Sequence, residues 1–358
     1  MEHRAWPLGL ALIASTGGAV ALPACVDPID EHTSAVGEVV RDCVVPEPAG
    51  VAGWGAPASL EYPDHSLWLW DQVDLAGGGS VAGAAAVVAD AAGACSQGPA
   101  FVTDAGGRPV SLLALTAGEE AANAARTDGK RLALLPRGGF VHDGTGYLFY
   151  VEALLGPGFF DAQELGTGLC VLVPGATSCE RVLAGGDPIL WPGTTRMLDR
   201  GGLVVGDRAI VAGCRKVAAF VTPCTVSGAP IDRVRDPAAW QVWNAFDGWI
   251  DDATNATELM DTQGALTLSA YGGGYLATTL DLFENRVDVR RSDKATDGYG
   301  HPIDLFDTVP DSFFPAGGRE HSGLRHGDAR TLHVSYVTDG AAAPGLHLVS
   351  FRFYGDPE

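Results

Sequence analysis

The sequence predicts an all-β fold, and three observations support this prediction. The chain of 358 residues contains 48 Gly and 22 Pro, which penalise helix interiors and favour turns, but only 3 Met. Short runs rich in Val, Leu, Tyr and Trp recur along most of the chain, separated by turns of Gly, Pro, Asp or Asn. These runs continue without a convincing internal linker, so we expect them to belong to one body.

The first 25 residues have the pattern of an export signal. His3 and Arg4 precede a mostly apolar run over residues 6–20, which is too short and too interrupted by Gly to be a good transmembrane helix. Residues 22–25 resemble a bacterial lipobox, although the proline in this stretch departs from the usual pattern. Lipidation of Cys25 and ordinary cleavage nearby both stay open. Either outcome predicts a secreted or cell-envelope protein, and an N-terminal lipid on Cys25 would be its only membrane attachment.

The remaining cysteines indicate a disulfide framework. Without Cys25, the chain keeps an even number of cysteines, and six cysteines allow 15 pairings. No Cys-x-x-Cys pair is present and the expected compartment is oxidising, so disulfides are favoured over zinc. Short loops that contain Pro favour the pairs Cys170–Cys179 and Cys214–Cys224. Elimination then leaves Cys43–Cys95 as the third pair.

We expect residues 26–50, which are acidic and contain Pro, to form a linker, and residues 51–358 to form the folded domain. Residues 118–131 have helical composition. The predicted strands cover residues 66–73, 84–89, 110–115, 147–155, 170–173, 203–205, 209–212, 218–221, 265–271, 275–282, 286–291, 331–337 and 346–353.

So many strands in one body must avoid exposed sheet edges. Antiparallel four-stranded sheets arranged around an axis leave only short, protected edges. At about 60 residues per blade, the domain would form a five-bladed β-propeller. A pair of β-sandwiches is the main alternative.

Several segments carry a resemblance to a known family. Residues 264–276, residues 285–293 with Arg290 and Ser292, and residues 320–324 resemble blades of the five-bladed propellers of arabinanase-type and fructosidase-type glycoside hydrolases. Residues 63–71 and 147–150 resemble the hairpins of the first two blades. The resemblance covers most of residues 51–353. It implies a bacterial propeller of a domain-of-unknown-function family related to these enzymes, with an arabinan-like polysaccharide or oligosaccharide as its partner.

Cleavage of a glycosidic bond needs a pair of carboxyl groups. Asp71, Glu152 and Glu320 are the candidate catalytic acids, because each lies where a blade is expected to reach the central funnel. In the family, the acids lie on the innermost strands of the early blades. Here residues 51–56 contain no carboxylate and the second blade offers Arg137. A hydrolase, and a non-catalytic glycan-binding or envelope scaffold propeller, therefore both stay open.

Aromatic side chains interleaved with polar ones are the second signal, because sugar rings stack on aromatic faces while their hydroxyls bond to polar groups. The resemblance also implies that the closing blade brings a histidine to the funnel. The candidate substrate-binding residues are Trp54, Arg137, Trp243, Asp247, Trp249 and His321.

The charge and the missing motifs exclude other chemistry. With 44 acidic and 23 basic side chains, the net charge of −21 opposes binding of a nucleic acid backbone. The motifs of phosphate-binding loops, α/β-hydrolases and zincins are not present. We expect a monomer without a cofactor or metal site. The acidity and the resemblance leave a Ca²⁺ ion in the channel open, although no EF-hand loop is present.

Overall fold

The computed structural model describes residues 36–156, 162–193, 198, 200–215, 217, 222–262, 265–309, 316–326, 328–338 and 344–355. All of them belong to one compact unit, His32–Glu358. The expected export signal and the lipidation site Cys25 lie outside the described residues, as does the strand expected over residues 218–221. None of the described helices is long and apolar enough to cross a membrane.

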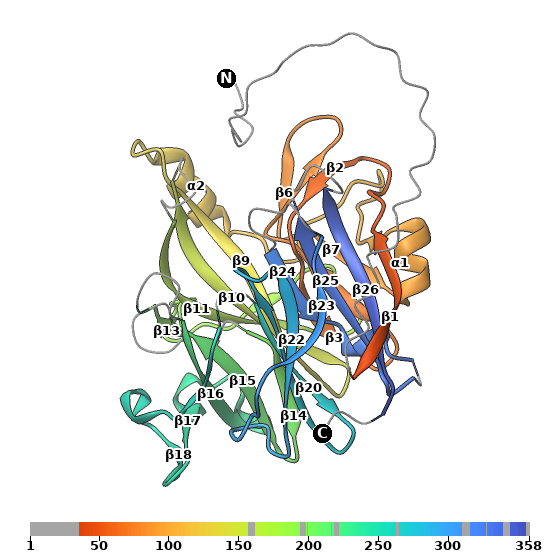
Figure 1. Cartoon of the computed structure of the whole chain (residues 1–358). Helices are drawn as coiled ribbons and strands as arrows, with labels where there is room; N and C mark the ends of the chain where they lie inside the picture. The colour runs from red at the N-terminus through yellow and green to blue at the C-terminus, as the bar shows by residue number, and fades with distance from the viewer. Residues whose placement is uncertain are drawn as a thin grey trace, which may run out of the picture. The chain divides into compact units, whose positions relative to one another are not determined.

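Five antiparallel sheets of four or more strands follow one another along the described chain, and we number them I to V (Figure 1). Sheet I contains β3 (Ala58–Glu61), β4 (Ser66–Leu69), β7 (Ala85–Val88) and β8 (Ala100–Phe101). Sheet II contains β9 (Arg131–His142), β10 (Thr145–Leu155), β11 (Ala162–Leu172) and β12 (Glu180–Arg181), and β13 (Trp191–Pro192) also pairs with β11. Sheet III contains β14 (Gly202–Val205), β15 (Arg208–Cys214), β16 (Pro223–Pro230), β17 (Gln241–Asn244) and β18 (Gly248–Ile250), and β19 (Glu258–Asp261) also pairs with β16.

Sheet IV contains β20 (Leu266–Tyr271), β21 (Gly274–Asp281), β22 (Arg286–Ser292) and β23 (Ile303–Asp307). Sheet V contains β24 (Ala316–Glu320), β25 (Thr331–Thr338), β26 (Gly345–Phe353) and β1 (Gly37–Val44). A small sheet is formed by β2 (Val51–Trp54), β5 (Gln72–Leu75) and β6 (Ser80–Ala82). The helices of the described chain are α1 (Ala91–Gln97), α2 (Ala117–Ala125) and the 3-10 turns η1 (Ile231–Arg233), η2 (Pro237–Ala239), η3 (Ala253–Asn255) and η4 (Ser322–Leu324).

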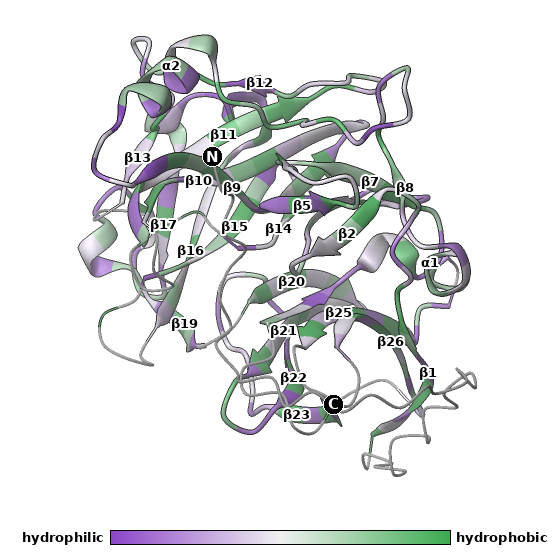
Figure 2. Cartoon of the chain, turned by 90° about the horizontal axis from the view of Figure 1, so that it is seen from above, coloured by the Kyte–Doolittle hydropathy of each residue, from purple (hydrophilic) through white to green (hydrophobic). Residues whose placement is uncertain are grey.

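The first strands of the sheets lie together. β3 packs against β9, β9 against β14, β14 against β20, and β20 against β24. In Figure 2, β14 and β20 lie near the middle of the view, whereas β12, β17, β23 and β1 lie toward the periphery. Side chains on first strands therefore approach one another although their sequence positions are far apart.

Two glycines permit the close approach of neighbouring sheets. A Cβ atom at Gly201 would lie 3.0 Å from the Cα atom of Thr267 in β20. Gly318 in β24 has φ of +77°, and a Cβ atom there would lie 2.4 Å from the Cβ atom of Leu280. A larger residue at Gly318 would have to displace Leu280 in β21 and would strain the backbone.

Apolar clusters between adjacent sheets form the core. The cluster between sheets II and III includes Phe149, Val211 and Trp240, and the cluster between sheets IV and V includes Val289 and Phe351. Strand alternation places the strand residues of these clusters on the inner faces, and Trp240 joins them from the end of η2, so burial against the next sheet stabilises each one.

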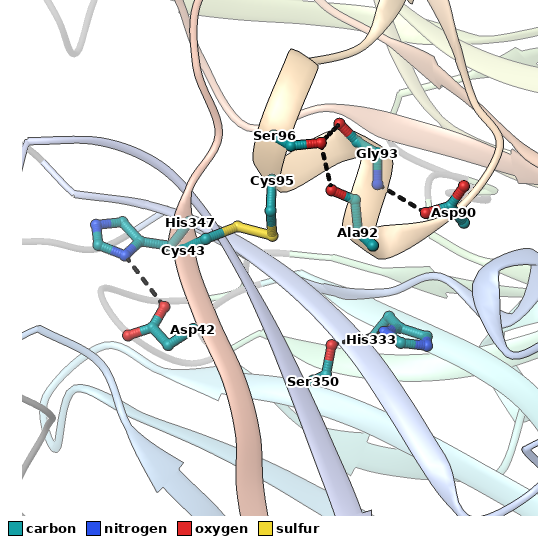
Figure 3. Close-up of a disulfide and its surroundings, with 10 residues drawn as sticks. All are labelled: Asp42, Cys43, Asp90, Ala92, Gly93, Cys95, Ser96, His333, His347 and Ser350. Carbon is teal, nitrogen blue, oxygen red and sulfur yellow. Dashed lines mark hydrogen bonds and ion pairs between the residues drawn. A yellow bond between two sulfur atoms is a disulfide. The ribbon is translucent and has the colours of Figure 1, made fainter.

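The N-terminal segment corrects the expected domain boundary. Residues 37–44, predicted as linker, form β1, which pairs with β26 as the fourth strand of sheet V (Figure 1). Cys43 of β1 is bonded to Cys95 of α1, and α1 packs against β7 and β26. Figure 3 shows this disulfide beside the ion pair of Asp42 with His347, whose Oδ1 and Nδ1 atoms are 3.6 Å apart. The first and last sheets are thereby joined covalently.

The three predicted disulfides, Cys43–Cys95, Cys170–Cys179 and Cys214–Cys224, are all present. The antiparallel, mostly β architecture is also confirmed, and α2 overlaps the first half of the segment of helical composition. The strand expected over residues 110–115 is wrong: these residues form a single bridge, from Ser111 to Ala84, and otherwise follow an irregular path. The helix α1 was not predicted.

Candidate functional site

The strand expected over residues 66–73 is divided at the candidate acid Asp71. β4 of sheet I ends at Leu69 and β5 of the small sheet begins at Gln72. The backbone carbonyl of Asp71 accepts a hydrogen bond from Gly83, which holds the turn between the two sheets. Asp71 therefore lies at a strand end, as predicted, with 47% of its side chain exposed.

Two arginines from other sheets lie close enough to Asp71 to act on its charge. The Nη1 atom of Arg137 in β9 is 3.6 Å from the Oδ2 atom of Asp71. Arg319 in β24 donates a hydrogen bond from Nη1 to the backbone carbonyl of Arg137 over 2.5 Å. We call these three residues, contributed by sheets I, II and V, the central cluster.

Backbone irregularities place both arginines. In the pairing of β9 with β10, Pro136 lies opposite Tyr150 and Gly138 opposite Phe149, so Arg137 is the extra residue of a β-bulge. A second irregularity, at Gly318, directly precedes Arg319. Bulges re-aim side chains locally and are frequent beside functional sites.

The electrostatics of the central cluster favour polar binding. Desolvation by the surrounding protein raises the pKa of the Asp71 carboxyl, and the positive charges of Arg137 and Arg319 oppose that rise. Arg319 is buried and supports the backbone of Arg137, whereas the partly exposed guanidinium of Arg137 offers donors and the exposed carboxyl of Asp71 offers a pair of acceptor oxygens. This is a pattern that suits the hydroxyl groups of a sugar.

Glu152, the second candidate acid, belongs to a different network. Its Oε2 atom is 3.3 Å from Nη2 of Arg181, and Nη1 of Arg181 is 2.7 Å from Oε2 of Glu119 in α2. Arg181 also donates from Nε to the hydroxyl of Tyr150. Burial raises the pKa of Glu152, and Arg181 opposes that rise. Only 8% of the Glu152 side chain is exposed, and through Arg181 it connects β10 and β12 of sheet II to α2.

Glu320, the third candidate acid, is buried. Its side chain is 1% exposed, and its Oε1 atom is 2.9 Å from Nη2 of Arg325. Burial raises the pKa of Glu320, and Arg325 opposes that rise. Arg325 also donates to the backbone carbonyl of Ala270 and the hydroxyl of Ser269 in sheet IV. This ion pair connects sheets IV and V, which is a structural role.

His321 is also a core residue in the structure, with an exposed fraction of 0%. Its Nε2 atom is 2.8 Å from the hydroxyl of Ser335 and its Nδ1 atom is 3.2 Å from Oε1 of Glu61. The ring lies 4.7 Å from that of Trp68. Both nitrogens are thus engaged by protein groups, and the expected contact with substrate is not supported. Instead, His321 joins sheet V to the end of β3 in sheet I.

Trp54 is half-buried in an aromatic cluster rather than standing alone. Its ring stacks on Trp70 with centroids 5.5 Å apart, and on Phe101 at 6.1 Å. The cluster packs around the Cys43–Cys95 disulfide. This packing explains the position of Trp54 without a ligand.

The remaining predicted residues lie on the β17–β18 hairpin of sheet III. Trp243 and Trp249 are cross-strand partners, and their ring centroids are 5.3 Å apart. Both line a cavity of about 410 Å³. Asp247 lies in the exposed turn of the hairpin, where its backbone N–H donates to the side chain of Asn244.

The sequence therefore predicted two members of the central cluster, Asp71 and Arg137, and missed Arg319. The signal available for Arg319 was its place directly before Glu320, in the segment that resembles a closing blade. Among the residues that the structure describes, no group of three or more His, Cys, Asp or Glu side chains is arranged to hold a metal ion.

Comparisons with known proteins identify relatives of the fold. No protein-family model matches the sequence, and no curated protein matches it significantly. A candidate hydrolase from Bacteroides ovatus is 13% identical, with a TM-score of 0.58 over 85% of this chain and 87% of that one. A GH43_1 enzyme from Xanthomonas citri is 10% identical, with a TM-score of 0.51 over 88% and 91%. The same enzyme complexed with xylotriose is similar at 10% identity and a TM-score of 0.51, over 88% and 90%.

These similarities confirm the predicted resemblance at the level of fold: the structural neighbours are glycoside hydrolase propeller enzymes. At such low identity, the chemistry must be argued from this chain's own residues.

Proposed function

We propose that this protein is a glycan-binding protein in which sheets I to V form a five-bladed propeller and the central cluster binds a sugar unit. The observation that carries the proposal is the convergence of Asp71, Arg137 and Arg319 from three sheets, with Asp71 accessible to solvent. A carboxylate beside guanidinium groups can accept and donate hydrogen bonds to adjacent hydroxyls of one sugar ring.

Binding is favoured over cleavage because the central cluster offers one carboxyl group. The charged neighbours that shift the pKa of Asp71 are both arginines. Glu152 and Glu320 are engaged by Arg181 and Arg325 in buried ion pairs. A glycosidase needs two carboxyl groups about 5–10 Å apart across the scissile bond.

The prediction is that Arg137→Met and Asp71→Asn each weaken glycan binding about tenfold, because each removes a charged hydrogen-bonding group. Affinity electrophoresis in gels containing arabinan, fructan or xylan measures this change. Arg233→Met is the matched control, since Arg233 forms an exposed pair with Asp236 away from the cluster. Equal retention of the wild type and both cluster variants would exclude the central cluster as the binding site.

Hydrolysis is the second candidate function, and the raised pKa of Asp71 favours it, because a general acid must be protonated near the working pH. An assay for new reducing ends on arabinan, fructan and xylan separates the candidates. Turnover that Asp71→Asn abolishes, while binding persists, would favour a hydrolase. Retained binding with no turnover would favour the non-catalytic protein.

We also propose that the protein acts outside the cytoplasm, as a secreted or lipid-anchored protein. The export pattern of residues 1–25 supports this, and so do the three disulfides, which persist in oxidising compartments. Intact mass measurement of the mature protein should find an N-terminus at or near Cys25, with added acyl mass if Cys25 is lipidated. An unprocessed chain would contradict export by this signal.

A further inference from the structure

The β17–β18 hairpin carries an aromatic site at a different place from the central cluster. The site, which we call the Trp243–Trp249 pocket, is a cavity of about 410 Å³, within the usual size range for small ligands. The turn from β14 to β15 contributes to its lining. That turn precedes the second strand of sheet III, whereas Asp71 follows the second strand of sheet I, so the two sites lie at opposite strand ends of their sheets. Figure 1 shows β17 and β18 at the lower left, with α2, β2 and β6 at the top.

The walls of the pocket combine aromatic rings with fixed polar groups. Trp243, Trp249 and Tyr275 line it, and all three are half-buried. Trp243 donates from its indole nitrogen to Oδ2 of Asp297 over 2.8 Å, which fixes this ring against sheet IV. The guanidinium of Arg208 lies 4.5 Å from the ring of Trp249 and donates to the carbonyl of Gly228. The aromatic walls are therefore held in place before any ligand arrives.

The charges around the pocket balance. Asp207 and Asp293 contribute two carboxylates to the lining, and Arg208 and Lys294 contribute two cations. A ligand of either charge would be repelled by the two lining groups of the same sign. A hydroxyl group can donate to the carboxylates and accept from the cations. Aromatic rings with hydroxyl-binding groups at their edge match the apolar face and polar rim of a sugar ring.

We propose that the Trp243–Trp249 pocket is a second glycan-binding site, which takes one neutral sugar unit of a polymer. The choice of a glycan as the ligand rests on the proposed function, whereas the location of the site rests on the residues that line the pocket. A polymer bound at both sites would gain avidity over either site alone. The pocket would therefore serve attachment to a polysaccharide, independently of the central cluster.

Isothermal titration with arabinohexaose and xylohexaose tests the proposal. We expect Trp249→Ala to weaken binding at least tenfold in the Arg137→Met background, where the central cluster is weakened and the pocket is intact. Phe246→Ala is the matched control, because Phe246 is an aromatic residue of the same hairpin, 96% exposed, that does not line the pocket. Its affinity should equal that of Arg137→Met alone.

A measurement on the wild-type protein tests the pocket even if Trp249→Ala disrupts the fold of the hairpin. Hydroxyl-radical footprinting of the wild type should show that arabinohexaose or xylohexaose protects Trp243 and Trp249, while Phe246 stays reactive. Binding that Arg137→Met abolishes, with no protection of the two tryptophans, would overturn the pocket and leave the central site standing. Binding that is lost in Trp249→Ala and kept in Arg137→Met would overturn the central cluster as the binding site and leave the pocket standing. No binding of either hexasaccharide would overturn both.

Discussion

Replacing Arg325 by methionine is expected to lower the free energy of unfolding by about 3–5 kcal/mol. The substitution leaves the carboxyl of Glu320 with 1% exposure and without its cation. It also removes the hydrogen bonds of Arg325 to Ala270 and Ser269 in sheet IV. Urea denaturation of the two proteins at pH 7 measures the difference.

The pH dependence identifies the cause. Burial raises the pKa of Glu320 in the folded state, so the folded carboxyl holds its proton more readily than the unfolded one. Its contribution to stability is present at low pH and is lost as pH rises through the folded pKa. Arg325 opposes the rise in the pKa of Glu320. The loss of unfolding free energy in Arg325→Met should therefore be largest at neutral pH and above, and should shrink as the solution is acidified.

Two further variants make this prediction decisive. Arg352→Met is the matched control, because Arg352 and Asp328 form a pair whose side chains are 50% and 44% exposed, so its loss should cost less than about 1 kcal/mol. Adding Glu320→Gln to Arg325→Met should recover part of the stability, since it removes the unpaired charge. A loss for Arg325→Met no larger than that of the control would show that the buried pair does not stabilise the fold, and would reopen Glu320 as a functional acid.

The sequence predicted most of what depends on local composition. The strand runs, their turns and the short disulfide loops could be read from neighbouring residues, because alternation and turn chemistry act within about ten residues. The linker error has a local cause as well. β1 is an edge strand whose burial pattern is mostly exposed or half-exposed, so its sequence lacks the apolar alternation of a strand with one buried face.

The site was less predictable, because it depends on contacts between distant parts of the chain. Arg319 of sheet V meets Arg137 of sheet II beside two strand irregularities, at Gly318 and next to Gly138. Glycine in a strand can mark a bulge, but in a chain with 48 glycines this signal does not single out these two positions. Glu320 and His321 were expected at the funnel because of their position in the closing blade. Burial instead assigned them to the interfaces that sheet V makes with sheets IV and I. The Trp243 and Trp249 pair was recognised by its polar interleaving, which matches its place at a half-exposed hairpin.

Removing the Cys43–Cys95 disulfide is expected to lower the free energy of unfolding by about 4 kcal/mol in the chain-entropy account, with a separation of 52 residues between the cysteines. The change is made with Cys43→Ser and Cys95→Ser together, so that no free thiol remains. The bond fixes β1, an exposed edge strand, to α1, which packs on β7 and β26. Denaturation of the oxidised proteins measures the loss, and hydrogen exchange should show faster exchange of β1 amides.

The Cys170–Cys179 pair supplies the matched comparison, because it closes a loop within sheet II with a separation of only 9 residues. Its removal should cost about 2–3 kcal/mol and should leave exchange in β1 unchanged. The order of the two losses follows from where each bond acts: one restrains a local turn, the other joins the first sheet to the last. A smaller loss for Cys43–Cys95 than for Cys170–Cys179, with β1 still protected, would mean that pairing with β26 alone holds β1 in sheet V.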